Sequence, residues 1–356
     1  MNNSLLVLLL ILVLTTAGCS QSISPSEIST PSPQLSSEEI LHHEEPTPQT
    51  LVKNDGTTPS PIMEPSSKPS PQPSPPQPSS PQPLPSPPEP TFCTALEIEY
   101  ISDSPSPSID KKVDVFGIPV LATKRFTEPK TKHVANVLAK YIDNDEDGTP
   151  DNPTVAKVIV EKNVGMILTV NDDESERVFD QWDLLSKYGH PWNYQEQFLD
   201  ETDPSRAFDA ALEETLHVIT DAGYDNAYPN VFGEHSGSTL ANLMDNARGG
   251  HFKESLTYNE DLPWLGNSAV PSRYPAGAWY TYDDETCTYE CMITEYIYWG
   301  LTSILGAQEN RSDEIEHEWK LHTKELVQER DPGLYNLLTD PQWGLPTELP
   351  DGSYCE

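Results

Sequence analysis

The sequence predicts an α+β fold that is mainly helical, with a small sheet near the start of a folded region spanning residues 91–356. Two observations lead to this prediction. Proline is concentrated before residue 91, and β-branched residues cluster soon after it, whereas most of the remaining sequence has apolar residues at helical spacing. No internal repeat with a period of about 20 to 50 residues is visible, so a solenoid or propeller is not expected.

The predicted strands come first and lie between turn signals rich in Ser, Pro and Asp, where β-branched and aromatic residues alternate or cluster. They span residues 96–101, 113–123 and 166–170. Most of the other apolar segments repeat every three to four residues, which is typical of amphipathic helices. The predicted helices span residues 133–142, 154–162, 174–185, 205–221, 238–246, 291–306 and 313–330. Two aromatic tracts, residues 192–194 and 279–282, are expected to pack on the core or to line a cleft.

The charge of the chain restricts its partners. Its 356 residues include 57 acidic and 21 basic side chains, which give a formal net charge of −36. Nucleic-acid binding requires clustered Lys and Arg, and the sequence has no such cluster. The acidic side chains form a solvated surface that favours divalent cations over anionic polymers.

The N-terminal segment predicts export. Residues 5–14 are all apolar. At about 1.5 Å per residue, however, a helix of this length is too short to cross a bilayer core of about 30 Å. This pattern is typical of a signal peptide, here residues 1–18. Thr16, Ala17 and Gly18 lead directly into Cys19, a sequence that resembles the lipobox of bacterial lipoproteins.

That resemblance implies that Cys19 becomes the lipidated first residue of the mature chain. Two or more acyl chains would anchor it stably, because each buried methylene contributes about 0.8 kcal/mol. We then expect a globular domain outside the cytoplasm, held at the cell membrane or the outer membrane. A plain secretory signal is the alternative.

Residues 19–90 are predicted to be a lipidated N-terminus followed by a linker. Of the 36 prolines in the chain, 20 lie between residues 20 and 90, among Ser, Gln, Thr and Glu. Such a composition cannot bury enough apolar surface to offset the entropy of ordering. We therefore expect disorder with extended polyproline character.

Four cysteines remain in the predicted domain, namely Cys93, Cys287, Cys291 and Cys355. An even number in an exported chain favours disulfides over a thiolate metal site. Three pairings are possible. We favour Cys93 with Cys355, because domain termini often lie close together, and Cys287 with Cys291, which requires a helix to begin at about Cys291.

Residues 143–154 have the spacing of an EF-hand loop. The loop is preceded and followed by predicted helices, and Gly148 at position 6 permits the sharp bend. It resembles EF-hand and dockerin-type calcium loops, which implies that Ca²⁺ is held by Asp143, Asp145, Asp147, Thr149 and Asp151. Position 12 is Thr154 instead of a bidentate glutamate, so binding is weaker or a more distant carboxylate closes the loop. An acidic turn without an ion is the alternative.

A second polar group lies within an apolar-periodic segment around Glu213, Glu214 and His217. On a helix, Glu213 and His217 share one face, as do the two ligands of a His-Glu-x-x-His helix. This resembles the active-site helix of zincin metallopeptidases, with Glu213 in place of the first histidine. The resemblance implies that Glu213 and His217 bind Zn²⁺ and that Glu214 is the general base.

A third ligand would come from a later helix, as in gluzincins, and Glu295 is the best choice. It is a lone acid in a strongly apolar helix, and burying it without a partner would be costly. Glu234, His235 and His251 are further possible ligands or substrate contacts.

These motifs predict a zinc-dependent hydrolase at the cell surface or in the periplasm, with a peptide or a polysaccharide as substrate. A non-enzymatic, calcium-stabilised surface binding module is the main alternative. An ordinary amphipathic helix with no metal also fits residues 213–217. A weaker alternative is a di-iron site built from two Glu-x-x-His pairs, Glu214 with His217 and Glu314 with His317.

Overall fold

A computed structural model of the protein describes residues 93–206, 208–252 and 268–355. The predicted signal peptide, Cys19 and the linker therefore lie outside the described residues. Among the described helices, none has both the length and the apolar character needed to cross a membrane.

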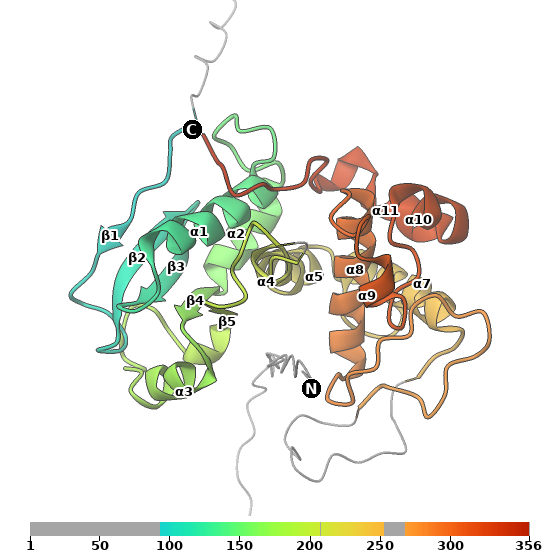
Figure 1. The fold of residues 1–356 in the computed structure, drawn as a ribbon. Coiled ribbons are helices and arrows are strands. Elements are labelled where there is room, and N and C mark those ends of the chain that lie inside the picture. Colours follow the sequence, from blue (N-terminus) through green and yellow to red (C-terminus); the bar gives the residue numbers. More distant parts are fainter. Residues whose placement is uncertain (1–92, 207, 253–267, 356) are drawn as a thin grey trace, which may run out of the picture. The chain divides into compact units, whose positions relative to one another are not determined.

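A five-stranded mixed sheet forms one part of the fold (Figure 1). Its strands are β1 (Glu99–Tyr100), β2 (Ile109–Val115), β3 (Ile118–Thr123), β4 (Gly165–Thr169) and β5 (Tyr194–Phe198). They lie in sequence order. Strands β1 to β3 pair antiparallel, whereas β3, β4 and β5 are parallel. The α+β class is thus confirmed, but the sheet is not confined to the start of the domain, because two strands follow the first helices.

The single strand predicted over residues 113–123 is wrong, because these residues belong to two strands, β2 and β3, that form a hairpin. Phe116 and Gly117 form its two-residue turn, with φ of 52° and 89°, and Val115 pairs with Ile118. Positive φ at both central residues is typical of the type I′ turns that suit twisted hairpins. The turn was missed because phenylalanine rarely takes this conformation.

The first three helices lie close to their predicted positions. They are α1 (Glu128–Ile142), α2 (Pro153–Glu161) and α3 (Asp172–Asp180). Helix α1 begins five residues earlier than predicted, with a proline in its first turn, where a missing N–H costs nothing. Helix α3 ends earlier than predicted, at Asp180.

The predicted helix over residues 205–221 is shorter at its start and changes type. Helix α4 (Ala211–His217) continues as a π-helical segment (Val218–Tyr224) and then as α5 (Asp225–Ala227). A side chain at Gly223 would meet Val155 of α2 at 2.6 Å, so glycine allows the π-helical segment to pack closely on α2. Two further helices follow, α6 (Pro229–Phe232) and α7 (Thr239–Arg248).

The last part of the chain is helical around α8 (Tyr289–Ile304), all of whose residues except Glu290 are buried. Helix α8 begins two residues before the predicted start. The single helix predicted over residues 313–330 is wrong, because the chain forms two separate helices there. They are α9 (Ser312–Ile315) and α10 (Lys324–Arg330), and α11 (Pro332–Leu338) follows.

Alternation along the strands distributes the core to both faces of the sheet. Val120 and Met166 join the main core with α1, α2, α4 and α8, whereas Leu121 and Ile167 join a smaller cluster with Trp182. Helix α4 contacts α1, β5 and α8. It therefore connects the sheet to the C-terminal helices, and this is where the polar residues of the site lie.

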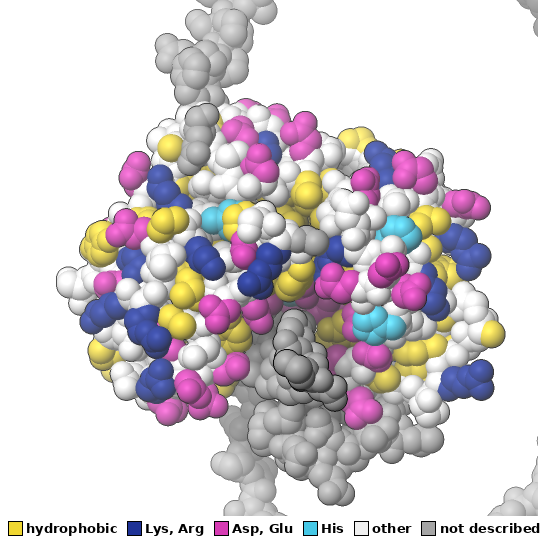
Figure 2. All heavy atoms as spheres, in the orientation of Figure 1, with side chains coloured by type: hydrophobic (Ala, Val, Ile, Leu, Met, Phe, Trp, Pro, Cys, Tyr) yellow, Lys and Arg dark blue, Asp and Glu magenta, His cyan; other side chains and the backbone are white. Residues whose placement is uncertain are grey.

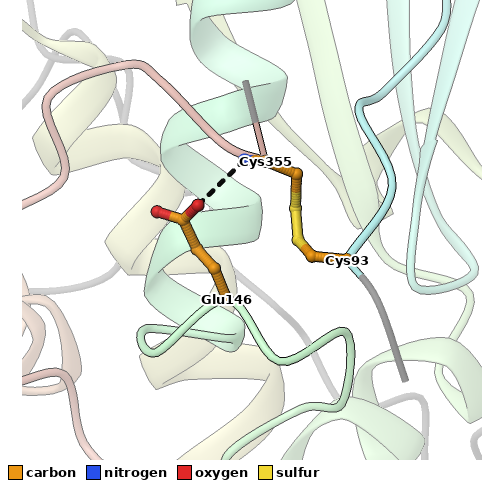
Figure 3. A group of neighbouring side chains, drawn as sticks. All are labelled: Cys93, Glu146 and Cys355. Carbon is orange, nitrogen blue, oxygen red and sulfur yellow. Dashed lines mark hydrogen bonds between the residues drawn. A yellow bond between two sulfur atoms is a disulfide. The ribbon is translucent and has the colours of Figure 1, made fainter. Parts of the chain in front are cut away.

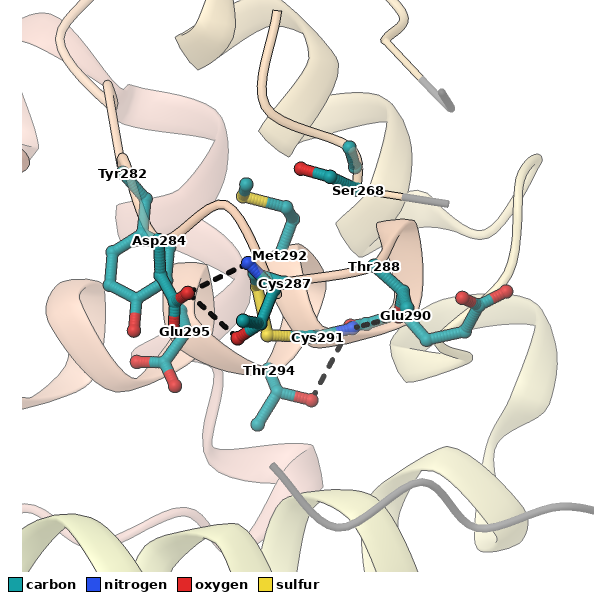
Figure 4. The surroundings of a disulfide bond; sticks show 12 residues. Ser268, Tyr282, Asp284, Cys287, Thr288, Glu290, Cys291, Met292, Thr294 and Glu295 are labelled. Carbon is teal, nitrogen blue, oxygen red and sulfur yellow. Dashed lines mark hydrogen bonds between the residues drawn. A yellow bond between two sulfur atoms is a disulfide. The ribbon is translucent and has the colours of Figure 1, made fainter. Parts of the chain in front are cut away.

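Both predicted disulfide pairings are confirmed. Cys93 is bonded to Cys355 across a sequence separation of 262, and Cys287 to Cys291 across a separation of 4. Figure 4 shows the second bond at the start of α8, near Glu295.

Candidate metal centre

The structure brings together the three residues predicted to bind zinc. Glu213 and His217 lie one turn apart on α4, and Glu295 faces them from α8. The Nε2 atom of His217 lies 3.9 Å from Oε1 of Glu213 and 3.6 Å from Oε1 of Glu295. One ligand atom from each residue lies within 4.8 Å of the other two.

This spacing fits a small divalent cation. With bonds of about 2.0–2.2 Å, neighbouring ligands of tetrahedral zinc are about 3.4 Å apart. The distances to His217 exceed that by only a few tenths of an ångström. Small side-chain rotations would therefore bring all three ligands onto one ion.

The hydrogen bonding of the group is incomplete. His217 is only 4% exposed, and neither of its ring nitrogens has a hydrogen-bond partner among the described residues. Oε2 of Glu295, which is 3% exposed, also lacks one. A buried polar group without a partner costs about 1–3 kcal/mol. A cation between His217 and Glu295 would satisfy one ring nitrogen and the Glu295 oxygen.

Burial shifts the pKa values of all three residues. For the two carboxyl groups, a bound cation would shift the pKa in the opposite direction. Burial lowers the pKa of His217 to about 4, so its imidazole is neutral and has a lone pair for a metal. Burial raises the pKa of Glu213 to about 7. Burial, followed by the nearby charges of Glu213 and Glu214, raises the pKa of Glu295 well above its ordinary value. A divalent cation would offset this repulsion.

Glu214, the predicted base, lies beside the group but has its own partner. It is half-buried, and Gln195 of β5 donates a hydrogen bond to its Oε2. Burial and the neighbouring Glu213 raise its pKa well above the ordinary value. Glu214 is thus held from the sheet side, next to the three residues that could bind a metal.

More acidic residues surround the group. Thr294 donates to Oε1 of Glu234 at 2.8 Å and to Oδ1 of Asp221 at 3.3 Å, so these two carboxyl groups lie on either side of its hydroxyl. Glu318 of a nearby loop adds a further charge that raises the pKa of Glu295. Figure 2 shows a hollow in the middle of this face with acidic side chains at its walls.

Sequence reasoning missed Tyr298 and Gln195, which contact the predicted ligands and base. Tyr298 lies three residues after Glu295, on the same side of α8, and its ring centroid is 6.0 Å from that of His217. That spacing was a usable signal. Gln195 gave none, because its strand, β5, was not predicted.

The calcium-loop residues also lie together. Asp143, Asp145 and Asp147 each place one carboxylate oxygen within 4.8 Å of the other two. Gly148 takes a φ of 85°, as the predicted bend requires. Asp151 is close enough that the charges of the other three aspartates contribute to raising its pKa, after burial. Thr154 lies in the first turn of α2, outside this group.

The C-terminal segment covers this loop. The Tyr354 hydroxyl donates to Oδ2 of Asp143, and the backbone N–H of Glu348 donates to Oδ1 of Asn144 at 2.9 Å. Figure 3 shows Glu146 accepting a hydrogen bond from the backbone N–H of Cys355, beside the disulfide to Cys93. The loop is therefore tied to both ends of the domain.

The remaining predicted residues lie elsewhere. His235 is exposed and bonds the carbonyl of Pro229, and His251 pairs with Asp245 at 2.6 Å. The two predicted aromatic tracts differ in burial. Trp192 of the first is half-exposed, whereas Tyr280 of the second lies in the core.

The di-iron hypothesis is wrong in its second pair of residues. Helix α9 ends at Ile315, so Glu314 and His317 do not share a helix. Glu314 pairs with Arg311 at 2.8 Å instead.

Comparisons with protein-family models, with curated proteins and with solved structures found no match in any of the three. Function is therefore inferred from the chemistry of the site, which is the firmer basis even where a fold is shared.

Proposed function

We propose that the domain is a zinc-dependent hydrolase with Glu213, His217 and Glu295 as metal ligands. The observation that carries this proposal is the buried His217 imidazole, which lies between two buried carboxylates with both nitrogens lacking hydrogen-bond partners among the described residues. A neutral imidazole with two carboxylates is a donor set that zinc accepts. Three protein ligands leave a position for water, as in catalytic zinc sites.

Glu214 is the proposed general base. Zinc would supply Lewis acidity toward water and toward the bond to be cleaved. Glu214 would take the proton of the attacking water and later return it to the leaving group. The Gln195 amide keeps its carboxylate beside the ligands.

A peptide is the substrate that the surroundings of Glu214 favour. Among the described strands, β5 pairs only with β4, so it is an edge strand, and it carries Gln195. An extended peptide can add to a sheet edge through main-chain hydrogen bonds. Such a chain would lie next to Glu214. A polysaccharide would not use these backbone groups in the same way.

We further propose that the loop at residues 143–154 binds Ca²⁺ and stabilises the domain. Three convergent aspartates and the glycine bend support this, together with Asp151 nearby. The lipobox-like sequence before Cys19 supports lipid anchoring of an exported protein. Fatty-acid labelling that marks wild type and Cys19→Ala equally would contradict the anchoring.

Metal analysis of the purified protein tests the central proposal. We expect about one zinc per chain in the wild type, lost in His217→Ala and retained in the control His235→Ala, which changes an exposed histidine. A wild-type protein that binds calcium but no zinc would contradict the hydrolase. That result would support the non-enzymatic, calcium-stabilised binding module instead.

A further inference from the structure

A second group that combines an imidazole with two carboxylates lies outside the proposed zinc centre. One ligand atom each from Asp283, His317 and Glu318 lies within 4.8 Å of the other two. Nε2 of His317 is 3.4 Å from Oε1 of Glu318. Neighbouring ligands of tetrahedral zinc are also about 3.4 Å apart. The group therefore has the donor types of the first centre at a spacing that suits the same ion.

Backbone hydrogen bonds hold the two chain segments of this group side by side. Tyr280 pairs antiparallel with Trp319, and both side chains are fully buried. The N–H of Thr281 donates to the carbonyl of Glu318, and the Thr281 hydroxyl donates to the carbonyl of His317, both at 2.6 Å. The fold thus brings the three potential ligands together without any contribution from a bound ion.

The two carboxylates of the group have no Lys or Arg partner within the described ranges. The ion pair between His317 and Glu318 is the one that either acid makes there. Two carboxylates held this close repel each other, and a divalent cation would replace that repulsion by attraction. The imidazole favours Zn²⁺ over Ca²⁺ and Mg²⁺, because those harder ions prefer oxygen ligands.

We propose that Asp283, His317 and Glu318 form a second zinc site, which shares no ligand with the first. Asp283 and His317 are exposed and Glu318 is partly buried, so this ion exchanges with zinc in solution. It would link the segment around Asp283 to the loop that follows α9. Figure 4 shows Tyr282, the residue before Asp283, beside Glu295. The second ion would therefore fix a segment that also borders the first centre.

The test counts the zinc bound to the full chain in equilibrium dialysis against added Zn²⁺. Excess Ca²⁺ is present to occupy the loop at residues 143–154. We expect His317→Ala to bind one zinc fewer per chain than the wild type, and Asp283→Asn to lose the same ion. Both residues are exposed, so neither change removes a side chain from the core.

Two nearby residues provide matched controls. His322→Ala changes a histidine of the same loop that belongs to none of the possible metal groups among the described residues. Asp284→Asn changes the aspartate next to Asp283, whose Oδ1 accepts hydrogen bonds from the N–H and the hydroxyl of Thr286. Both controls should bind as much zinc as the wild type.

The outcomes separate this site from the proposed function. Equal zinc binding by His317→Ala and the wild type would overturn the second site alone, as would an equal loss in His322→Ala. His217→Ala should lose the ion of the first centre and keep the ion that depends on His317. Zinc that depends on His317 but not on His217 would support the second site and overturn the hydrolase.

Discussion

Glu213 and Glu214 are adjacent in sequence, yet the structure gives them different partners. Glu213 faces His217, whose Nε2 lies 3.9 Å from its Oε1, whereas Gln195 from β5 donates a hydrogen bond to Glu214. One carboxylate is therefore held toward His217 and Glu295, and the other toward the sheet edge. This division is what a metal ligand and a neighbouring general base require.

Replacing Glu214 with Gln should separate catalysis from metal binding. The amide keeps the size of the side chain but cannot accept a proton, so hydrolysis of a peptide substrate should fall about 10²–10⁴-fold. Zinc content, measured on the same sample, should stay near that of the wild type. Glu213→Gln is the matched comparison and should lose zinc as well as activity. Parallel loss of zinc in both variants would contradict the assigned roles.

Glu196 offers a prediction that does not depend on the proposed function. It is 9% exposed, Ser175 bonds its Oε1, and its Oε2 has no partner among the described residues. Burial raises its pKa from 4.5 to about 6. The folded state therefore holds this proton more tightly than the unfolded state does. The resulting stabilisation is full below pH 4.5 and is lost as the pH rises through about 6.

Glu196→Gln should remove that dependence, because the amide stays neutral at every pH. Above pH 7 the variant should be more stable than the wild type by about 2 kcal/mol, since one pKa unit corresponds to about 1.4 kcal/mol. Below pH 4.5 the two should unfold alike. Denaturant unfolding at several pH values measures this. A constant difference between the proteins across that range would show that Glu196 does not titrate with folding.

The proposed calcium loop joins helix α1 to helix α2. Helix α2 in turn packs on the π-helical segment that follows His217. At calcium one hundredfold above the dissociation constant, the gain in stability should be about 2.7 kcal/mol. Asp145→Ala should abolish the gain, and Glu176→Ala, an exposed acid of α3, should not. Thermal unfolding with and without calcium provides the measurement. Equal shifts in both variants would mean that the loop is not the site.

Local patterns explain which elements could be predicted. The i, i+4 relation of Glu213 and His217 needs only a helix, and Glu295 stood out because an isolated acid in an apolar helix requires a partner. The turn at Phe116 was not recognisable, since its residues lack the Asn-Gly signal of such turns.

Strand β5 was missed for a different reason. Its sequence, Tyr-Gln-Glu-Gln-Phe, carries three polar residues, and two of them are buried only through tertiary contacts. Gln197, for example, bonds Thr202 inside the fold. Without that strand, the partner of Glu214 could not be identified. The grouping of Glu213, His217 and Glu295 was thus predictable from local spacing, whereas the contact between Gln195 and Glu214 depended on the complete fold.

At the scale of the whole domain, the two disulfides close chain segments of very different length. The bond from Cys93 to Cys355 spans 262 positions, and that from Cys287 to Cys291 spans only 4. In the chain-entropy account, stabilisation grows with the logarithm of the loop length. Comparing the removal of each bond therefore gives a matched test within one protein.

In this account the double variant Cys93→Ala with Cys355→Ala should lose about 5–6 kcal/mol of stability, against about 2 kcal/mol for Cys287→Ala with Cys291→Ala. The first should also weaken calcium binding, because it releases the segment whose Tyr354 bonds Asp143. Denaturant unfolding and calcium titration of both variants measure the two effects. Unchanged calcium affinity without the long-range bond would show that the C-terminal segment stays on the loop by its own contacts. Removal of the short-range bond could instead cause the larger loss of stability. That result would mean that the Cys287–Cys291 bond holds the start of α8, and with it Glu295, in place beyond its effect on loop entropy.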